Sequence, residues 1–302
     1  MSDTRKMIVS GASGLVGSAL VERLEADGVQ VVRLVRGGVK DPAREAHWDP
    51  AQREIDAAAL EGADTVFHLA GKGIAEQRWS PEVKRQIVES RTVGTRLLAE
   101  ALAGLENKPR VLVSASATGL YGNRGAEVLD EDSPAGAGFL PDTCQQWEAA
   151  CQPAWEAGVR VVQTRIGLVL SPKGGALGKM LPVFRKGIGG VIGRGDQMMS
   201  WITIDDLVHV LRFVADNDAL HGAVNAVSPG AVSNRQFTKA LGKQINRPTI
   251  FPTPAGALRV AMGEMAGPLL LEGAHVQPKR LLEAGFEFES NDLQHALAHL
   301  LG

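Results

Sequence analysis

The sequence predicts an α/β protein built on a Rossmann-type, doubly wound parallel sheet, with a smaller substrate-side region towards its C-terminus. Three observations lead to this prediction. A glycine-rich turn joins a strand to a helix near the N-terminus, apolar strands alternate with amphipathic helices as far as residue 170, and the sequence after that is rich in glycine and cations. The 302 residues are enough for one large domain and a smaller one.

The glycine-rich turn predicts a site for a dinucleotide. The segment "GASGLVG" places Gly11, Gly14 and Gly17 three residues apart, between the apolar strand "MIV" and the helix "SALVERLEADG". Such glycines provide a tight turn, a close backbone approach to a pyrophosphate and close packing of helix on strand, while the helix N-terminus offers free N–H groups. A turn that only joins two elements is the alternative, but its position between strand and helix favours the nucleotide. The predicted contacts are Gly11, Ser13, Gly14, Leu15, Val16 and Gly17.

The end of the next strand, "VQVVRLV", predicts which dinucleotide binds. Enzymes that prefer NAD place an Asp or Glu about 20 residues beyond the glycines, where it bonds the ribose 2′-hydroxyl. No acidic residue occurs between Val29 and Lys40, and Arg36 stands at the end of the strand instead. A guanidinium there suits a 2′-phosphate, with Lys40 as a second cation, so NADP(H) is the predicted cofactor. A solvated surface arginine is the alternative.

Further along, apolar strands are predicted at 64–71, 110–116 and 159–170, with a long helix at 81–102. Ligands of an open parallel sheet bind outside the carboxyl ends of the strands, where small residues gather in "HLAG", "SASATGLYG" and "RIGLVL". The alternative to a cofactor floor is tight packing, with His68 as a core histidine. The predicted cofactor contacts here are His68, Leu69, Ala70, Gly71, Ser114 and Arg165.

Beyond Leu170 the chain changes character. The predicted division has a Rossmann domain at 1–170 with 203–228 returning to it, and a smaller region at 171–202 and 229–302. Within the returning segment, Thr203 and Asp206 have the spacing of a helix capping box, and "GAVNAVS" has the pattern of a strand that rejoins the sheet. Helices are predicted near 234–244, 255–265 and 291–301.

Composition and charge argue against several classes of protein. The formal net charge is −2 with both signs mixed along the chain, so no basic face for nucleic acid is expected. No apolar run approaches the roughly 18 residues of a membrane helix, and no signal peptide is expected. Cys144 and Cys151 lie seven residues apart on one predicted helix, which indicates reduced thiols and a cytoplasmic protein. No metal site is predicted, because His295 and His299 lack the intervening glutamate of a zinc-protease helix.

The motifs together resemble those of the extended short-chain dehydrogenases/reductases, the superfamily of NAD-dependent epimerases and dehydratases. The matching segments are "GASGLVG", "HLAG", "SASATGLYG", "WITIDDLV" and "GAVNAVS". More narrowly, the chain resembles an atypical, epimerase-like family of unassigned substrate that carries a C-terminal domain of unknown function. That narrower resemblance rests on "QRW", "GGALGKMLPVF", "GDQMMSWI" and "LLLEGAHVQPKRLLEAGF", and it covers essentially the whole chain.

This resemblance implies a catalytic arrangement that the chain does not reproduce. In the superfamily, a Tyr and a Lys four residues apart on a helix transfer the proton, and a Ser at the end of the preceding strand binds the substrate oxygen. Ser116 matches that Ser, but the sole tyrosine, Tyr121, precedes the helix. Alignment of "CQQWEAA" with the superfamily helix puts Leu140 at the tyrosine position and Cys144 at the lysine position. The usual Tyr–Lys pair is therefore expected to be absent, and Ser116 and Tyr121 are the catalytic candidates.

Three functions stay open from the sequence. The first is an NADP(H)-dependent oxidoreductase or epimerase with a rearranged acid, acting on a small carbonyl, hydroxyl or nucleotide-sugar-like substrate. Further candidate bases for it are Glu127, Asp130, Glu131 and Asp142. The second is a non-catalytic NADP(H)-binding sensor or interaction protein, for which the missing pair is the main support. The third is a reductase whose substrate needs no strong protein acid.

The substrate pocket is expected under the segment "GDQMMSWI", because the resemblance places that loop over the active site. Gln197, Ser200 and Trp201 are its predicted residues, with a core anchor as the alternative for Trp201. The partner is thus a small-molecule substrate rather than nucleic acid or a membrane. A homodimer through the long helix at 81–102 is a further possibility that the resemblance raises.

Overall fold

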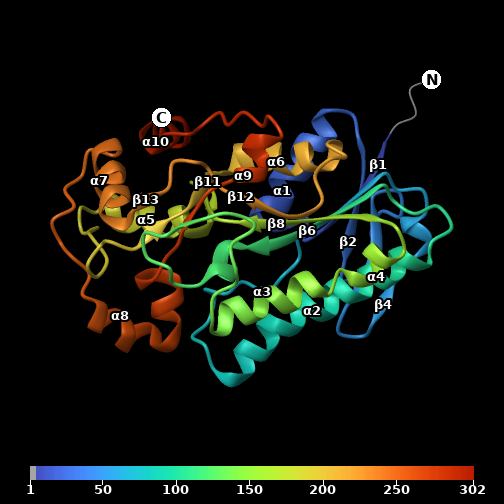
Figure 1. The fold of residues 1–302 in the computed structure, drawn as a ribbon, viewed down its shortest axis with the longest axis horizontal. Coiled ribbons are helices and arrows are strands. Elements are labelled where there is room, and N and C mark those ends of the chain that lie inside the picture. The colour runs from blue at the N-terminus through green and yellow to red at the C-terminus, as the bar shows by residue number, and fades with distance from the viewer. Residues whose placement is uncertain (1–4) are drawn as a thin grey trace.

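An eight-stranded sheet forms the centre of the computed structural model, which describes residues 5–302 (Figure 1). Its strands run in the order β12 (Gly222–Ala226), β8 (Arg160–Ile166), β6 (Val111–Ala117), β5 (Thr65–His68), β1 (Lys6–Ser10), β2 (Gln30–Val35), β3 (Glu45–Asp49) and β4 (Glu54–Ile55). All neighbouring pairs are parallel except β3 and β4. The predicted doubly wound parallel sheet is confirmed.

Helices cover both faces of this sheet (Figure 1). On one face lie α1 (Leu15–Ala26) and α6 (Ile204–Asp216), and on the other lie α2 (Pro81–Gly104), α3 (Phe139–Ala149) and α4 (Gln152–Glu156). Side chains of a strand alternate between the two faces. Met7 and Val9 of β1 accordingly pack with α1 and α6, whereas Ile8 packs with α2. Both faces of the central strands are therefore apolar, as in other sheets covered on both sides.

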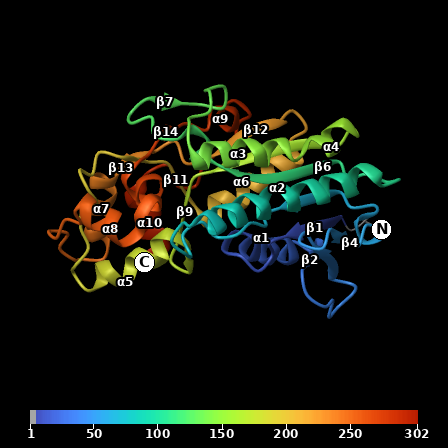
Figure 2. The same cartoon turned by 90° about the horizontal axis from the view of Figure 1, so that it is seen from below.

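A second core lies at one end of the molecule, far from the N-terminal strands (Figures 1 and 2). It gathers α5 (Gly175–Arg185), α7 (Asn234–Gln244) and α10 (Leu293–Leu301) around the fully buried Trp201. The remaining elements are the strand pairs β7 (Val128–Leu129) with β14 (His275–Val276), β9 (Leu168–Ser171) with β11 (Trp201–Thr203), and β10 (Met198–Met199) with β13 (Val232–Ser233), and the helices α8 (Ala255–Met262) and α9 (Lys279–Glu283). The division of the chain at residues 170, 202 and 228 stays a prediction, and its first four residues lie outside the described part.

Most predicted elements are confirmed. Helix α2 and the three helices predicted in the C-terminal part are present, and Thr203 caps α6 by accepting a hydrogen bond from the Asp206 amide at 3.1 Å. The strand predicted at 159–170 is two strands, β8 and β9, because the chain leaves the sheet at Gly167. A Cβ on Gly167 would lie 2.5 Å from the Ser200 carbonyl oxygen, so only glycine fits at this bend.

Two further expectations need correction. The sequence did not predict β3 and β4, whose polar segments lack the apolar run of the other strands. Cys144 and Cys151 do not share a helix, since α3 ends at Ala149 and Cys151 precedes α4. Both cysteines are nevertheless free and buried. From residue 5 onward, no helix is both long enough and apolar enough to cross a membrane.

The packing of α1 on the glycine-rich turn depends on the absence of a side chain at Gly17. A Cβ on Gly17 would lie 2.2 Å from the Gly11 carbonyl oxygen, far inside contact distance. We therefore expect Gly17→Ala to lower the free energy of unfolding by about 1–3 kcal/mol, as overpacking in a rigid site does. Urea denaturation measures this change.

Gly104→Ala is the matched control, because a Cβ on Gly104, at the end of α2, meets no atom within 4 Å. This control should leave stability unchanged or raise it slightly, since alanine is the better helix former. Equal stability of the two variants would contradict the role given to Gly17.

Candidate functional site

The N-terminus of α1 presents backbone N–H groups that have no partner. Gly11 adopts a left-handed conformation (φ +69°), and Gly14 then donates its amide to the Gly11 carbonyl at 3.0 Å. The amide of Ser18 is the first to bond into the helix, at 2.9 Å from the Gly14 oxygen. Among the described residues, no acceptor takes the amides of the preceding turn, and neither a side-chain cap nor an acidic residue occupies it. Free amides and the positive end of the helix dipole make this turn an anion site.

This turn lies where the strand order of the sheet reverses. Strand β1 sits between β2 and β5, so the chain proceeds to one side through β2 and to the other through β5. Crevices at such a switch point are the ligand sites of open α/β sheets. A Cβ on Gly11 would lie 2.8 Å from the backbone of Leu69 and of Ala70. The glycine turn and the loop after β5, which continues to Gly71, therefore meet along one edge of the crevice.

The start of α5, which belongs to the smaller core, also contacts the glycine turn. Positions for a Cβ on Gly174 and on Gly175 lie 3.4 and 3.2 Å from the Leu15 side chain. Lys179 of α5 donates to the Ala75 carbonyl at 3.2 Å. The start of α5 thus lies against the glycine turn, a contact that the sequence did not predict because Gly175 and Leu15 are 160 positions apart.

His68 belongs to the core, as the alternative interpretation has it. Both ring nitrogens are hydrogen-bonded, Nδ1 to Ser10 Oγ at 2.7 Å and Nε2 to Thr95 Oγ1 at 2.9 Å. The residue is fully buried. Burial lowers the pKa of His68 to about 4, so the ring is neutral near pH 7. Both ring nitrogens of His68 are therefore occupied within the protein, and a contact between this residue and the cofactor stays a prediction.

Arg36 and Lys40 lie exposed beyond the carboxyl end of β2. In the described part of the chain, neither side chain takes part in a hydrogen bond or an ion pair. Arg33, three residues before Arg36 and on β2 itself, is by contrast paired with Glu25 at 2.5 Å. The two cations next to the switch point are thus uncommitted, as a site for a phosphate requires.

At the carboxyl end of β6, both predicted serines are buried. Ser114 makes only a long contact, from its hydroxyl to the Ala115 carbonyl at 3.4 Å. Ser116 donates its hydroxyl proton to Glu148 Oε1 at 2.6 Å. Glu148 in turn accepts two hydrogen bonds from the Arg165 guanidinium, at 2.9 and 3.0 Å. Ser116 is therefore attached to a bidentate ion pair, the strongest class of side-chain contact.

Arg165 and Tyr121 are committed to this same network. Arg165 also donates to the Tyr121 hydroxyl at 3.0 Å, and Tyr121 donates to Asn225 Oδ1 at 2.7 Å. Tyr121 has no exposed surface. Burial raises the pKa of Tyr121, and the Arg165 guanidinium opposes only part of this rise. Tyr121 as a catalytic acid and Arg165 as a cofactor contact stay predictions, and the structure places both side chains in this buried network.

Leu140 and Cys144 face the short helix η2 (Thr118–Tyr121) that follows Ser116. A Cβ on Gly119 would lie 3.6 Å from Leu140 Cβ and 3.9 Å from Cys144 Sγ. Burial raises the pKa of Cys144 to about 12, so the thiol stays protonated near pH 7. A leucine and an un-ionised thiol therefore face η2 from α3, and the absence of the usual Tyr–Lys pair stays a prediction.

The three residues predicted for the substrate pocket join segments of the smaller core. Gln197 donates to the Leu270 carbonyl at 2.7 Å, and Ser200 donates to the Ala274 carbonyl at 2.8 Å. Trp201 donates its indole N–H to the Gly230 carbonyl at 2.7 Å and has no exposed surface. Trp201 is a core anchor, which was the alternative interpretation, and the side chains of Gln197 and Ser200 are almost wholly buried.

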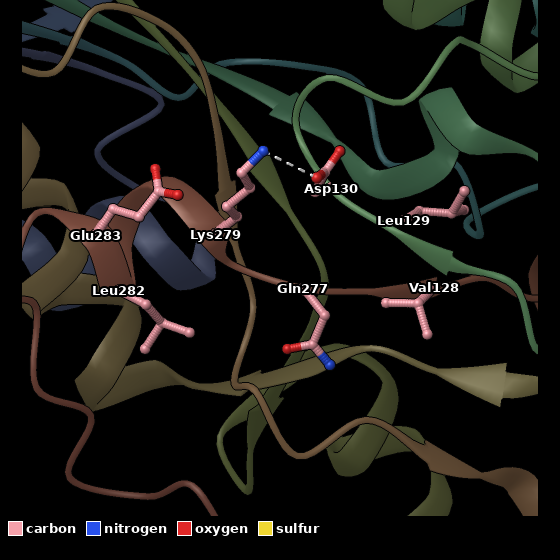
Figure 3. Close-up of a pocket in the computed structure, with 7 residues that line it drawn as sticks. All are labelled: Val128, Leu129, Asp130, Gln277, Lys279, Leu282 and Glu283. Carbon is pink, nitrogen blue, oxygen red and sulfur yellow. Dashed lines mark hydrogen bonds and ion pairs between the residues drawn. The ribbon is translucent and has the colours of Figure 1, made fainter.

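The four acidic candidates have different surroundings. Glu127 is paired with Arg124, and Asp142 is exposed at the start of α3. Asp130 lines a separate pocket of about 390 Å³ between β7 and α9, where Lys279 points at it from 3.2 Å (Figure 3). None of the predicted cofactor contacts lines this pocket. Glu131 turns inward, and its Oε1 accepts the Asn225 amide at 2.9 Å.

Glu148 is the site residue that the sequence analysis missed. It lies four residues after Cys144 on the same helix, and therefore on the same face. An acidic residue four positions after Cys144, on the same helix face, is a feature of the sequence that could have identified Glu148 as a site residue. Its partner Arg165 sits on another strand, however, and nothing in the local sequence pairs the two.

Comparison with protein families and known proteins agrees with this geometry. The model of the NAD dependent epimerase/dehydratase family matches residues 7–226, and that of a domain of unknown function, DUF1731, matches residues 253–300. An epimerase family protein of Mycobacterium bovis is 42% identical over 291 residues, which cover 96% of this chain and 96% of the relative. The human epimerase family protein SDR39U1 is 32% identical and covers 98% of this chain.

Two solved structures are similar over nearly the whole chain. The crystal structure of human SDR39U1 (isoform 2) with NADPH has a TM-score of 0.90 and 32% identity, covering 98% of both chains. A nucleoside-diphosphate sugar epimerase from Corynebacterium glutamicum has a TM-score of 0.81 and 35% identity, covering 99% of this chain and 59% of that one. With its glycine turn at the switch point and these matches, the chain belongs to the NAD-dependent epimerase/dehydratase family of extended short-chain dehydrogenases/reductases.

Proposed function

We propose that this protein binds NADP(H) at the switch-point crevice and acts as an oxidoreductase or epimerase. Its substrate class would be a small carbonyl, hydroxyl or nucleotide-sugar-like molecule. The observation that carries the proposal is the first turn of α1, whose free amides face no acid or cap at the reversal of the strand order. The relative that was solved with NADPH supports the choice of cofactor.

The chain has groups that suit each charged part of this cofactor. The glycine turn at Gly11, Gly14 and Gly17 would hold the pyrophosphate, since a Cβ on Gly11 or Gly17 would clash with neighbouring backbone and only glycine keeps the turn this tight. Arg36, with Lys40, would hold the 2′-phosphate, because both cations are exposed and uncommitted. When bound, the cofactor supplies the hydride donor or acceptor, and the protein supplies orientation and polar contacts.

The proton chemistry falls to Ser116 in this proposal. Because Ser116 directs its proton at Glu148, its oxygen keeps lone pairs that accept a hydrogen bond from a substrate hydroxyl. Leu140 and Cys144 take the positions of the usual Tyr–Lys pair, and neither supplies an acid near pH 7. The reaction would then proceed with a weakly assisted proton transfer, or on a substrate that needs no strong protein acid.

A second candidate is a non-catalytic NADP(H) sensor or interaction protein. The burial of Tyr121 favours it, because the one phenol of the chain is hydrogen-bonded to Arg165 and Asn225.

The proposal also includes the location and the oligomeric state of the protein. A cytoplasmic location is supported by the free, buried cysteines, and a homodimer through α2 is supported by exposed positions on that helix such as Glu89 and Arg96.

The variant Arg36→Ala tests whether the protein prefers NADPH to NADH. We expect wild-type protein to bind NADPH more tightly than NADH, and the variant to lose roughly tenfold or more in NADPH affinity with little change for NADH, because only NADPH carries the 2′-phosphate. Fluorescence titration gives both dissociation constants. Arg33→Ala removes a paired cation from the same strand and is the control. Equal affinity of the wild type for NADPH and NADH would contradict the proposal that Arg36 binds the 2′-phosphate.

Turnover of NADPH across a panel of aldehydes, ketones and nucleotide sugars separates enzyme from sensor. With an active substrate, Ser116→Ala should lose most of the activity. Tyr121→Phe should keep it but lower the free energy of unfolding by about 1–2 kcal/mol, because two buried partners lose a hydrogen bond. A folded Tyr121→Phe variant without activity would return Tyr121 to the mechanism. A panel without any turnover favours the sensor.

A further inference from the structure

Arg91 of α2 places a guanidinium at the rim of the crevice. Its Cζ and Nη2 atoms lie 3.4 and 3.5 Å from the position that a Cβ on Gly71 would take. Gly71 follows Ala70, whose backbone touches Gly11 of the glycine turn. The Arg91 guanidinium therefore lies beside the residue that follows the point where the loop after β5 meets the glycine turn. The sequence analysis assigned no role to it.

Three contacts hold this guanidinium in one orientation. Nη1 donates to the Lys72 carbonyl at 3.0 Å and to the Ile87 carbonyl at 3.1 Å. Cζ lies 4.9 Å from the centre of the Trp147 ring on α3, within the range of a cation–π contact. Such a fork is oriented before any ligand arrives, so little side-chain freedom is lost on binding.

The charge of Arg91 has no counter-charge in the protein. Two other arginines of α2, Arg85 and Arg96, pair with glutamates one turn away. Within residues 5–302, no carboxylate pairs with Arg91, although burial lowers its pKa and makes an unpaired charge costly. Arginine nevertheless stays protonated. An anion or a set of ligand oxygens at this place would offset that cost.

The remaining donors of Arg91 are open to solvent. Nε and Nη2 make no hydrogen bond within the described part of the chain, yet they are not among its buried unpartnered polar atoms. They therefore contact solvent beside Gly71, which is itself exposed. These free N–H groups form a planar fork that matches the oxygens of a phosphate and an adjoining ribose.

The position of Arg91 decides which part of a dinucleotide it can reach. Arg36 lies at the end of β2, on one side of the glycine turn, and would hold the adenosine half. Arg91 lies beyond β5, on the opposite side, where the crevice continues towards β6 and Ser116. We propose that Arg91 binds the nicotinamide-side ribosyl phosphate of NADP(H). This inference rests on the proposed function.

Isothermal titration of the full chain with three ligands tests the proposal. NADPH and 2′-phospho-ADP-ribose contain the second ribosyl phosphate, whereas adenosine 2′,5′-bisphosphate lacks it. Arg91→Gln should weaken the first two by roughly ten- to a hundredfold, the effect of losing a charge-assisted hydrogen bond. It should leave the third within about twofold, since that ligand does not extend to Arg91. Arg96→Gln, the same change at an exposed site of the same helix, should leave all three unchanged.

Arg91→Lys keeps the positive charge but lacks the planar guanidinium. It replaces Arg91→Gln as the test if the glutamine variant does not fold. It should show a smaller loss, confined to the same two ligands. Unchanged NADPH affinity in Arg91→Gln, or in Arg91→Lys if only that variant folds, overturns the inference. So does an equal loss for all three ligands, which indicates a packing role. Wild-type protein that binds none of the ligands refutes the proposed function itself.

Discussion

The buried ion pair between Glu148 and Arg165 is the interaction on which the region beyond the glycine turn depends. It joins α3 to β8 through two hydrogen bonds, at 2.9 and 3.0 Å. Ser116 is attached to one partner and Tyr121 to the other. Removing one member of such a buried pair costs about 3–5 kcal/mol, because the other charge is left without compensation. The polar groups at the end of β6 are therefore held in a rigid network, and their donors are directed at one another.

The crevice consequently has two halves of different chemical character. On the side of β2 and β5, the donors are uncommitted: the amides of α1, Arg36 and two nitrogen atoms of Arg91 have no acceptor in the described chain. On the side of β6 and β8, the donors are already paired, and the two positions on α3 carry an aliphatic side chain and an un-ionised thiol. The first half suits the binding of a phosphorylated dinucleotide. In the second half, the Ser116 hydroxyl and the Tyr121 hydroxyl both donate to groups of the protein itself.

The fold and the cofactor half of the site follow closely from the sequence, because their determinants are local. The glycine spacing, the strand before it and the helix after it all lie within one short segment. The predicted elements differ from the observed ones where the chain bends, as at Gly167, and where a strand is short and polar, as in β3. The missed residues have a different cause. Glu148 lies four residues after Cys144, but its partner Arg165 lies on β8, so the local sequence does not pair the two. The amphipathic pattern of α2 does not distinguish Arg91 from the other arginines of that helix.

By itself, the sequence determined the Rossmann architecture and the glycine turn after its first strand, and it predicted an anion site there and a preference for a 2′-phosphate, since each rests on neighbouring residues and backbone geometry. It also contains a single tyrosine. Only the tertiary structure decided what that tyrosine does. Its partner Asn225 lies 104 residues away, and Arg165 lies 44 residues away. The order β6, β8 and β12 in the sheet brings the three side chains together. The Tyr121 hydroxyl, which has no exposed surface, is hydrogen-bonded to both partners, because only the folded sheet places residues so far apart in sequence at hydrogen-bond distance.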